Sequence, residues 1–193
     1  ITTVYVLLIV GIALAKHSEF GPEAITMSLA MPFLISYAFS ALEKLLNGSS
    51  NGIFCLLLLI NCSSIADTFA YFTGMAIGKH KLAPVISPKK TIEGAVGGMI
   101  GSIIGTVVIC LVFNSVYDLK TNMLVLCLIT PFMVAVGIMG DLFTSAIKRT
   151  YGVKDYGKLM PGHGGILDRF DSVIFISPAV YCLVHFFGNI FVG

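Results

Sequence analysis

Six long apolar runs constrain the fold of this chain more than any other feature. They cover residues 1–15, 24–42, 52–77, 91–113, 123–147 and 170–192. A run of about 18 apolar residues or more is long enough to cross a bilayer as a helix, and a helix satisfies its own backbone groups inside lipid. The first run is short and begins at Ile1 without an initiator Met, so we expect it to be a truncated helix with further helices upstream. The sequence predicts an all-α, polytopic membrane bundle of about six helices, organised as one domain over residues 1–193.

Composition excludes an ordinary soluble protein. Hydrophobic residues make up 56% of the chain and charged residues only 11%, whereas soluble domains carry about 25% charged residues. The five cysteines all fall in apolar runs without metal-ligand spacing, which indicates small core residues and no disulfide framework. We expect no nucleic-acid partner.

Positive charge is divided very unevenly between alternate connections. Ten of the twelve Lys and Arg residues follow the first, third and fifth runs, and nine of these lie in the connections 78–90 and 148–169. Because basic loops stay in the cytoplasm, this pattern places both connections on the cytoplasmic side. Orientation alone needs fewer charges than nine, so we expect these two connections to do more than set topology.

The stretch 145–171 concentrates charge in an otherwise apolar chain. Five cations and three acidic residues are interrupted in the middle by the turn-forming segment Pro161–Gly165. The charged residues are Lys148, Arg149, Lys154, Lys158, Arg169, Asp155, Asp168 and Asp171. Arg can bind phosphate through two hydrogen bonds, and a glycine-rich backbone allows a ligand to approach closely. The stretch therefore predicts an anion and metal site at a membrane surface.

Two carboxylates fall inside apolar runs. Asp67 lies in the third run and Asp141 in the fifth, where a charged side chain costs roughly 2.5–3.5 kcal/mol on insertion scales and usually marks a site. A structural alternative is that Asp67 only hydrogen-bonds Asn61, Ser63 or Ser64. We favour a functional role, because intramembrane charges generally mark functional sites.

Carboxylates from two helices predict a Mg²⁺ site. Asp141 shares a helical face with Ser145 and Lys148, and Asp168 and Asp171 stand at the start of the sixth run. Mg²⁺ takes one or two protein carboxylates together with substrate phosphates, and the neighbouring cations would then hold those phosphates.

The connection before the fourth run has two interpretations. Ser87 and Pro88 are typical of a helix start, and Lys89 and Lys90 beside free backbone N–H groups would form a phosphate site. A capped helix with surface lysines explains the same residues equally well. The glycines that follow are spaced for close helix packing rather than for catalysis.

These motifs closely resemble the signature of phosphatidate cytidylyltransferases, also called CDP-diacylglycerol synthases. The first block is S-x-x-K-R-x4-K-D-x-G…P-x-H-G-G-x-x-D-R-x-D over residues 145–171, and the second is D-T-F-A-Y…G-K…S-P-K-K-T-x-E-G over residues 67–94. The resemblance covers about two thirds of the chain. Met160 replaces a usual Leu, Ile or Phe, and Met75 stands where Arg is common.

The resemblance implies a membrane catalytic domain that makes CDP-diacylglycerol and pyrophosphate from CTP and phosphatidate. It implies Asp141 and Asp168 as the metal pair, with Mg²⁺ and a second cation such as K⁺. Phosphates would be bound by Lys148, Arg149, Lys154, Arg169, Lys89 and Lys90. Ser87, His163, Gly164 and Gly165 would line the nucleotide pocket, and Asp67 and Asp171 would complete the polar cavity.

Two other functions were weighed against this one. A CTP-dependent polyprenol or phytol kinase would transfer the γ-phosphate instead, and a transporter would use Asp67 and Asp141 in a polar pathway. A transporter predicts internal repeats, and none is visible. We expect a bacterial inner membrane, an active site that faces the cytoplasm, and a homodimer as the candidate assembly.

Overall fold

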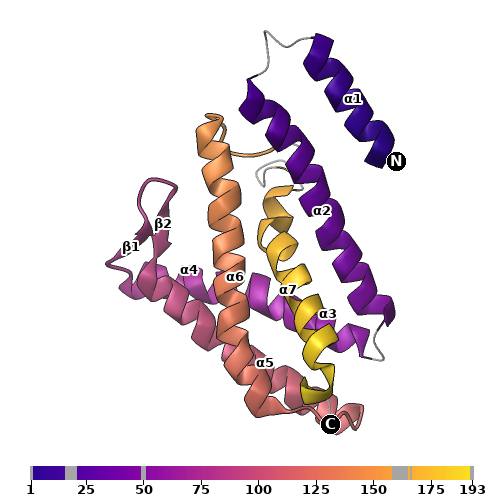
Figure 1. Cartoon of the computed structure of the whole chain (residues 1–193). Helices are drawn as coiled ribbons and strands as arrows, with labels where there is room; N and C mark the ends of the chain where they lie inside the picture. The colour runs from indigo at the N-terminus through magenta and orange to yellow at the C-terminus, as the bar shows by residue number, and fades with distance from the viewer. Residues whose placement is uncertain (1, 16–20, 49–50, 158–164, 166, 192–193) are drawn as a thin grey trace.

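The structure, a computed structural model, describes residues 2–15, 21–48, 51–157, 165 and 167–191. Its elements in chain order are α1 (Thr2–Ala15), α2 (Pro22–Gly48), α3 (Gly52–Ile60), the π-helix η1 (Asn61–Ile65), α4 (Ala66–Ile77), β1 (Lys81–Ala83), β2 (Ser87–Thr91), α5 (Ile92–Val116), α6 (Met123–Thr150) and α7 (Leu167–Phe191). Figure 1 shows α2, α7 and α6 side by side, with the α4–α5 pair crossing them.

The helical membrane bundle predicted from the sequence is confirmed. Within the described residues, four helices are long and apolar enough to cross a bilayer: α2, the continuous segment Gly52–Ile77, α5 and α6. The shorter α1 and the 25-residue α7 occupy the first and sixth apolar runs. The chain is a multi-pass membrane protein.

The interior of the bundle is apolar where α3, α5, α6 and α7 meet. Phe54, Leu59, Val134 and Ile176 are each almost completely buried there. One polar contact ties α7 to α2, because Ser177 Oγ donates a hydrogen bond of 3.0 Å to Ala38 O. This hydrogen bond and the shared apolar core hold α7 against its neighbours.

Glycines of α5 allow α4 to pack against it at close range. A Cβ on Gly94 would lie 2.7 Å from Ala70 O, and a Cβ on Gly98 would lie 2.8 Å from Ala66 O. Real Cβ atoms do not approach a carbonyl so closely, so these positions need glycine. The packing role predicted for this glycine pattern is confirmed.

The prediction that Ser87 caps the fourth helix is wrong. Residues 81–91 form an antiparallel hairpin with Lys81 opposite Thr91 and Ala83 opposite Ser87. The cap is Thr91, whose Oγ1 accepts a 3.1 Å hydrogen bond from Gly94 N. Pro88 fits in β2 because a two-stranded sheet has only edge strands, on which a missing N–H is tolerated.

Candidate active site

Lys90 and Asp141 form an ion pair between the hairpin and α6. The Lys90 Nζ atom is shielded from solvent, so the Asp141 carboxylate compensates a charge that would otherwise be costly to bury. Ser145 Oγ, one helical turn along α6, donates a 3.3 Å hydrogen bond to Asp141 Oδ1. Arg149 adds a second link, because its Nε donates to Ile86 O at 3.4 Å. These contacts fix the hairpin against the end of α6.

Asp171 brings a second carboxylate to Asp141. The two side chains interact directly across the α6–α7 contact, and Asp171 Oδ1 accepts a 2.7 Å hydrogen bond from Ser172 N. Asp67 of α4 is within electrostatic range of Lys90 and Asp141. It also lines a narrow cavity of about 10 Å³ between α4, α5, α6 and α7. The structure therefore brings three of the predicted acidic residues to one region.

Two of the three residues that the structural alternative names as partners of Asp67 have other hydrogen-bond partners. Asn61 Nδ2 donates to Ser102 O at 2.8 Å, away from Asp67. Ser63 Oγ donates to Ile60 O, and Ser64 O accepts from Thr68 Oγ1. The Asn61 amide donors and the Ser63 hydroxyl are therefore bonded elsewhere, whereas the bond at Ser64 involves only its backbone carbonyl.

Asp168 lies at the centre of a separate buried cluster. Its Oδ1 accepts a hydrogen bond from Lys148 Nζ at 2.8 Å, and its Oδ2 accepts from Tyr156 N and Gly165 N, both at 2.9 Å. The Lys148 and Asp168 side chains are only 9% and 8% exposed. The cluster joins α6, the segment after it and the start of α7 through one carboxylate.

Tyr156 packs against this cluster. Its hydroxyl donates to Thr144 O at 3.1 Å, and Lys148 Nζ lies 5.3 Å from the centre of its ring. Burial raises the pKa of the Tyr156 phenol, and the negative charges of Asp168 and Asp171 raise it further. The ring therefore stays neutral well above physiological pH.

Close packing just before α7 requires a glycine at position 165. A Cβ at this position would lie 2.9 Å from Gly157 N and 3.2 Å from Asp168 Oδ2. The glycine lets its own N–H reach the carboxylate. His163 and Gly164, predicted beside it, lie outside the described residues.

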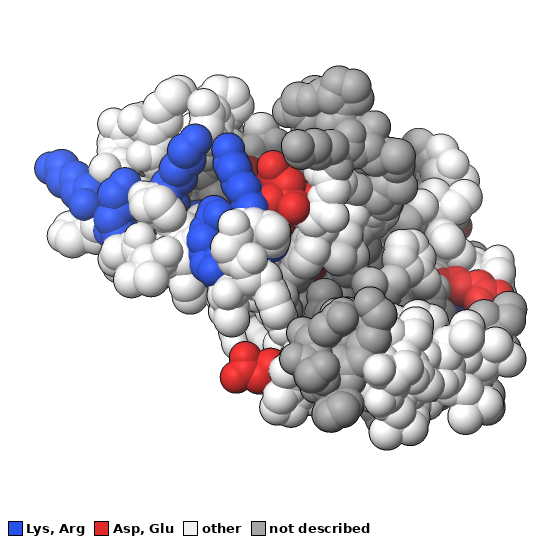
Figure 2. Space-filling model, turned by 90° about the horizontal axis from the view of Figure 1, so that it is seen from above, with Lys and Arg blue, Asp and Glu red and all other residues white. Residues whose placement is uncertain are grey.

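The remaining predicted cations lie at the surface of the same end. Lys89, Arg149, Lys154 and Arg169 are exposed, and Ser87 is half-buried in β2. Figure 2, seen from above, shows Lys and Arg side chains gathered on one side of this end with acidic side chains beside them. The exposed cations thus lie at the same end as the half-buried carboxylates of Asp141 and Asp171.

Asp141 and Asp168, predicted as a metal pair, have different partners in the structure. Asp141 contacts Lys90, Ser145 and Asp171, whereas Asp168 contacts Lys148 and two backbone N–H groups. Among the residues that the structure describes, no group of three or more His, Cys, Asp or Glu side chains is arranged to hold a metal ion. Their role as a metal pair stays a prediction.

Comparison with known proteins gives the family. The sequence model of the cytidylyltransferase family matches residues 1–187. The chain belongs to the cytidylyltransferase family. It is 46% identical over 122 residues to a phosphatidate cytidylyltransferase of Bacillus subtilis, covering 63% of this chain and 44% of that protein. It is 41% identical over 128 residues to one of Thermotoga maritima, covering 65% and 47%. The chain thus spans about half the length of the curated relatives it matches.

A solved structure shows a more distant likeness. It is described as "Structural insight into an intramembrane enzyme for archaeal membrane lipids biosynthesis" and is 23% identical, with a TM-score of 0.45. The match covers 67% of this chain and 77% of that one. A likeness at this level transfers neither geometry nor function.

Two features of the site in this chain were not predicted from the sequence. The first is the packing of Tyr156 on a lysine, although an aromatic residue inside a charged stretch can indicate a ring packed on a cation. Glu93 was read only as part of a motif. It accepts hydrogen bonds from the N–H groups of Lys79 and His80 and lies 2.6 Å from His80 Nδ1. These bonds fix the entry to the hairpin.

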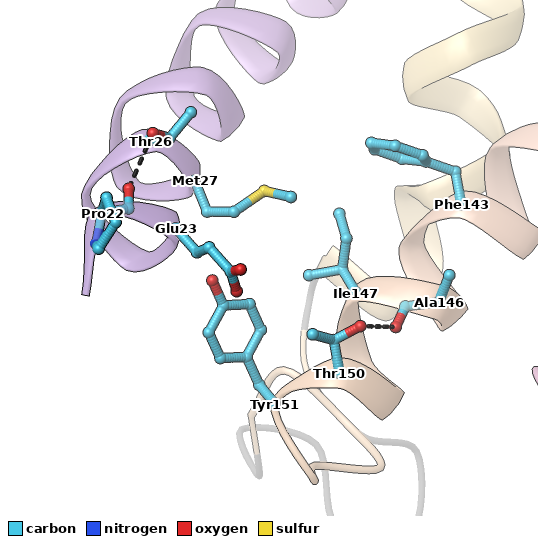
Figure 3. A pocket seen from close by; sticks show the side chains of 9 residues that line it. All are labelled: Pro22, Glu23, Thr26, Met27, Phe143, Ala146, Ile147, Thr150 and Tyr151. Atoms are coloured by element: carbon cyan, nitrogen blue, oxygen red, sulfur yellow. Dashed lines mark hydrogen bonds between the residues drawn. The ribbon is translucent and has the colours of Figure 1, made fainter. Parts of the chain in front are cut away.

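A wider cavity of about 510 Å³, which Asp67, Asp141, Asp168 and Asp171 do not line, lies between the start of α2 and the end of α6. Figure 3 shows Met27, Phe143 and Ile147 lining it, with the Glu23 carboxylate and the Tyr151 hydroxyl pointing toward each other. Phe143 and Ile147 stand on the opposite side of α6 from Asp141, because successive helical residues turn by about 100°. Size alone would select this cavity, but the charged chemistry lies on the other face.

Proposed function

We propose that this protein transfers CMP from CTP to phosphatidate, giving CDP-diacylglycerol and pyrophosphate. One observation carries the proposal: Lys90, Asp141 and Asp171 meet at the basic end of a membrane bundle that belongs to the cytidylyltransferase family. A reaction between a charged nucleotide and a lipid phosphate needs charge neutralisation at the membrane surface. The lipid tails remain in the bilayer while the head group enters the polar region between helices.

The chemistry requires no nucleophile from the protein. An oxygen of the phosphatidate phosphate attacks the α-phosphorus of CTP, and the bond to the β-phosphate oxygen breaks to release pyrophosphate. Negative charge builds on the transferring and leaving oxygens, so preorganised cations supply most of the catalysis. Buried cations act more strongly than exposed ones, because the local dielectric constant is lower.

Each predicted residue has a proposed role in this reaction. Lys148, Arg149, Lys154 and Arg169 are the proposed catalytic cations and bind phosphates. Substrates are further bound by Ser87, Lys89, Lys90, His163, Gly164 and Gly165, while Asp67 and Asp171 complete the polar cavity. In support, Lys90 and Lys148 are held against carboxylates, which keeps their positions fixed before substrate binds.

Asp141 and Asp168 are the proposed ligands of Mg²⁺, with K⁺ as a second cation. In support, Asp141 has a second carboxylate, Asp171, beside it, and adjoining carboxylate oxygens suit a hard cation, whereas the Asp168 oxygens already accept from Lys148 and two backbone N–H groups. A bound Mg²⁺ would polarise phosphate oxygens. Lys148 holds the Asp168 carboxylate in a fixed orientation, and Ser145 does the same for Asp141.

The basic end is proposed to face the cytoplasm of a bacterial cell, where CTP is available. The charge distribution supports this orientation, and the curated relatives are bacterial. We further propose that residues 1–193 act as a single membrane catalytic domain and that the protein assembles as a homodimer.

Product analysis tests the reaction against the kinase alternative, which the names of the curated relatives do not favour. Membranes that contain the protein would be incubated with phosphatidate, a polyprenol, phytol, Mg²⁺ and CTP labelled in either the α- or the γ-phosphate. We expect α-label in a lipid product and γ-label in pyrophosphate. Transfer of the γ-label to a lipid would instead establish a kinase. If neither label reached any lipid, both the cytidylyltransferase and the kinase function would be refuted.

A further inference from the structure

The π-helix η1 (Asn61–Ile65) interrupts the membrane helix just before Asp67. The Ala66 N–H donates to Asn61 O, five residues back instead of four. Such a turn accommodates one extra residue, so everything after it is rotated by about 100° relative to an unbroken α-helix. The direction in which Asp67 points therefore depends on η1 being present.

Asn61 attaches this wide turn to α5 from inside the bundle. The residue is completely buried, and its Nδ2 donates to Ser102 O at 2.8 Å and to Thr106 Oγ1 at 3.0 Å. Ser102 Oγ returns a 3.3 Å hydrogen bond to Asn61 O, the carbonyl that closes the π-turn. Both the side chain and the backbone of Asn61 are thus bound to α5.

Two further contacts fix the Asn61 amide. Thr106 Oγ1 also bonds Thr130 Oγ1 of α6 at 2.8 Å, which extends the network to a third helix. Asn61 Oδ1 has no hydrogen-bond partner among the described residues, and it rests directly on Gly105, where any Cβ would overlap it. A buried amide oxygen without a hydrogen bond is costly, so stability alone does not explain an asparagine at the π-helix.

We propose that Asn61 is a positioning residue: it holds η1 on α5 and so sets the direction in which Asp67 faces the Lys90–Asp141 pair. Lys90 immediately precedes Thr91, which caps α5, so α5 carries both the attachment point of η1 and the position of Lys90. The network thereby fixes Asp67 and Lys90 relative to one another. The activity readout of this inference rests on the proposed function, but its geometric readout does not.

The geometric test replaces Asp67 with Cys and measures how fast a small water-soluble thiol reagent labels position 67 itself, read from fragment ions that distinguish it from the native Cys55 and Cys62. Asn61→Ala and Gly105→Ala, which attack the contact from its two sides, should each slow this labelling severalfold. Ser177→Ala is matched to the first because it also removes a buried interhelical hydrogen bond. Gly11→Ala is matched to the second because a Cβ there meets nothing within 4 Å. Both controls should label like the parent.

The kinetic test uses the same substitutions in the chain with Asp67 intact. Asn61→Ala and Gly105→Ala should lower kcat about 10- to 100-fold, the cost of a small misplacement, while KM for CTP changes little. Unchanged labelling in both variants overturns the inference, whatever happens to kcat, and so does equal slowing in the controls. If the parent makes no CDP-diacylglycerol, the proposed function fails while the labelling still decides the role of Asn61.

Discussion

Lys90 on the β-hairpin and Asp141 within α6 form an ion pair. The pair connects the block 67–94 to the helix that leads into the block 145–171, although the two blocks are far apart in the chain. Since Asp171 also lies against Asp141, the Lys90 ammonium offsets two neighbouring negative charges. The hairpin is therefore part of the site rather than a simple connection.

Removing the Lys90 charge should abolish most activity. Lys90→Ala leaves Asp141 and Asp171 without their cation and removes a phosphate-binding group, so we expect kcat/KM to fall about 100-fold or more. The comparison is Lys81→Ala, which removes an exposed lysine from the other strand of the same hairpin. Equal losses in both variants would show that net hairpin charge, and not the Asp141 contact, is what matters.

The Lys148–Asp168 pair should contribute strongly to stability. Both side chains are almost fully buried, and removing one partner of a buried pair costs about 3–5 kcal/mol. We expect Lys148→Met to lower the free energy of unfolding in detergent by about that amount. The double variant Lys148→Met with Asp168→Asn should recover part of the loss, because Asn still accepts from Tyr156 N and Gly165 N. A double variant less stable than Lys148→Met alone would contradict this view of the pair.

Gly165 should tolerate no side chain. Its Cβ would press on both Gly157 N and Asp168 Oδ2, displacing the carboxylate, so Gly165→Ala should lower kcat about 100-fold. At Gly157 a Cβ would meet only Gly165 Cα, at 3.6 Å, and Gly157→Ala should be clearly milder. The two variants are compared by CDP-diacylglycerol synthesis at saturating CTP, and a reversed order would refute the steric argument.

Alkaline pH should destabilise the protein through Tyr156. Burial, followed by the charges of Asp168 and Asp171, raises the pKa of its phenol. A group with a raised pKa in the folded state contributes its full stability below the unfolded value, about 10 for Tyr, and that stability is lost as pH rises toward the folded pKa. Unfolding in detergent at neutral and alkaline pH measures the loss. Tyr156→Phe should reduce the alkaline loss, whereas Tyr71→Phe should leave it in place; identical pH profiles for the wild type and Tyr156→Phe would exclude this assignment.

The helices could be predicted because membrane spans are encoded in long apolar runs. The hairpin could not, because Ser87 and Pro88 have the same local preferences at a helix start as in an edge strand, and only the pairing with residues 81–83 decides between them. The π-helix could not be predicted either. Residues 52–60, which precede it, are apolar at nearly every position, so no alternation of apolar and polar residues shows where the helical periodicity changes. The resemblance implies that Asp67 and Asp171 complete a polar cavity, and the structure places both within electrostatic range of Asp141. The partners of Asp168 depend on how the chain turns between α6 and α7, which no local pattern specifies.

The central claim is that the Asp141 and Asp168 carboxylates support transfer of CMP to a lipid phosphate. The most direct measurement is CDP-diacylglycerol formation from CTP, phosphatidate and Mg²⁺ by membranes that contain the wild type, Asp141→Ala or Asp168→Ala at equal amounts of inserted protein. The wild type should form the product, and each variant should lose activity while remaining inserted in the membrane. Turnover like that of the wild type in either variant would contradict the claim.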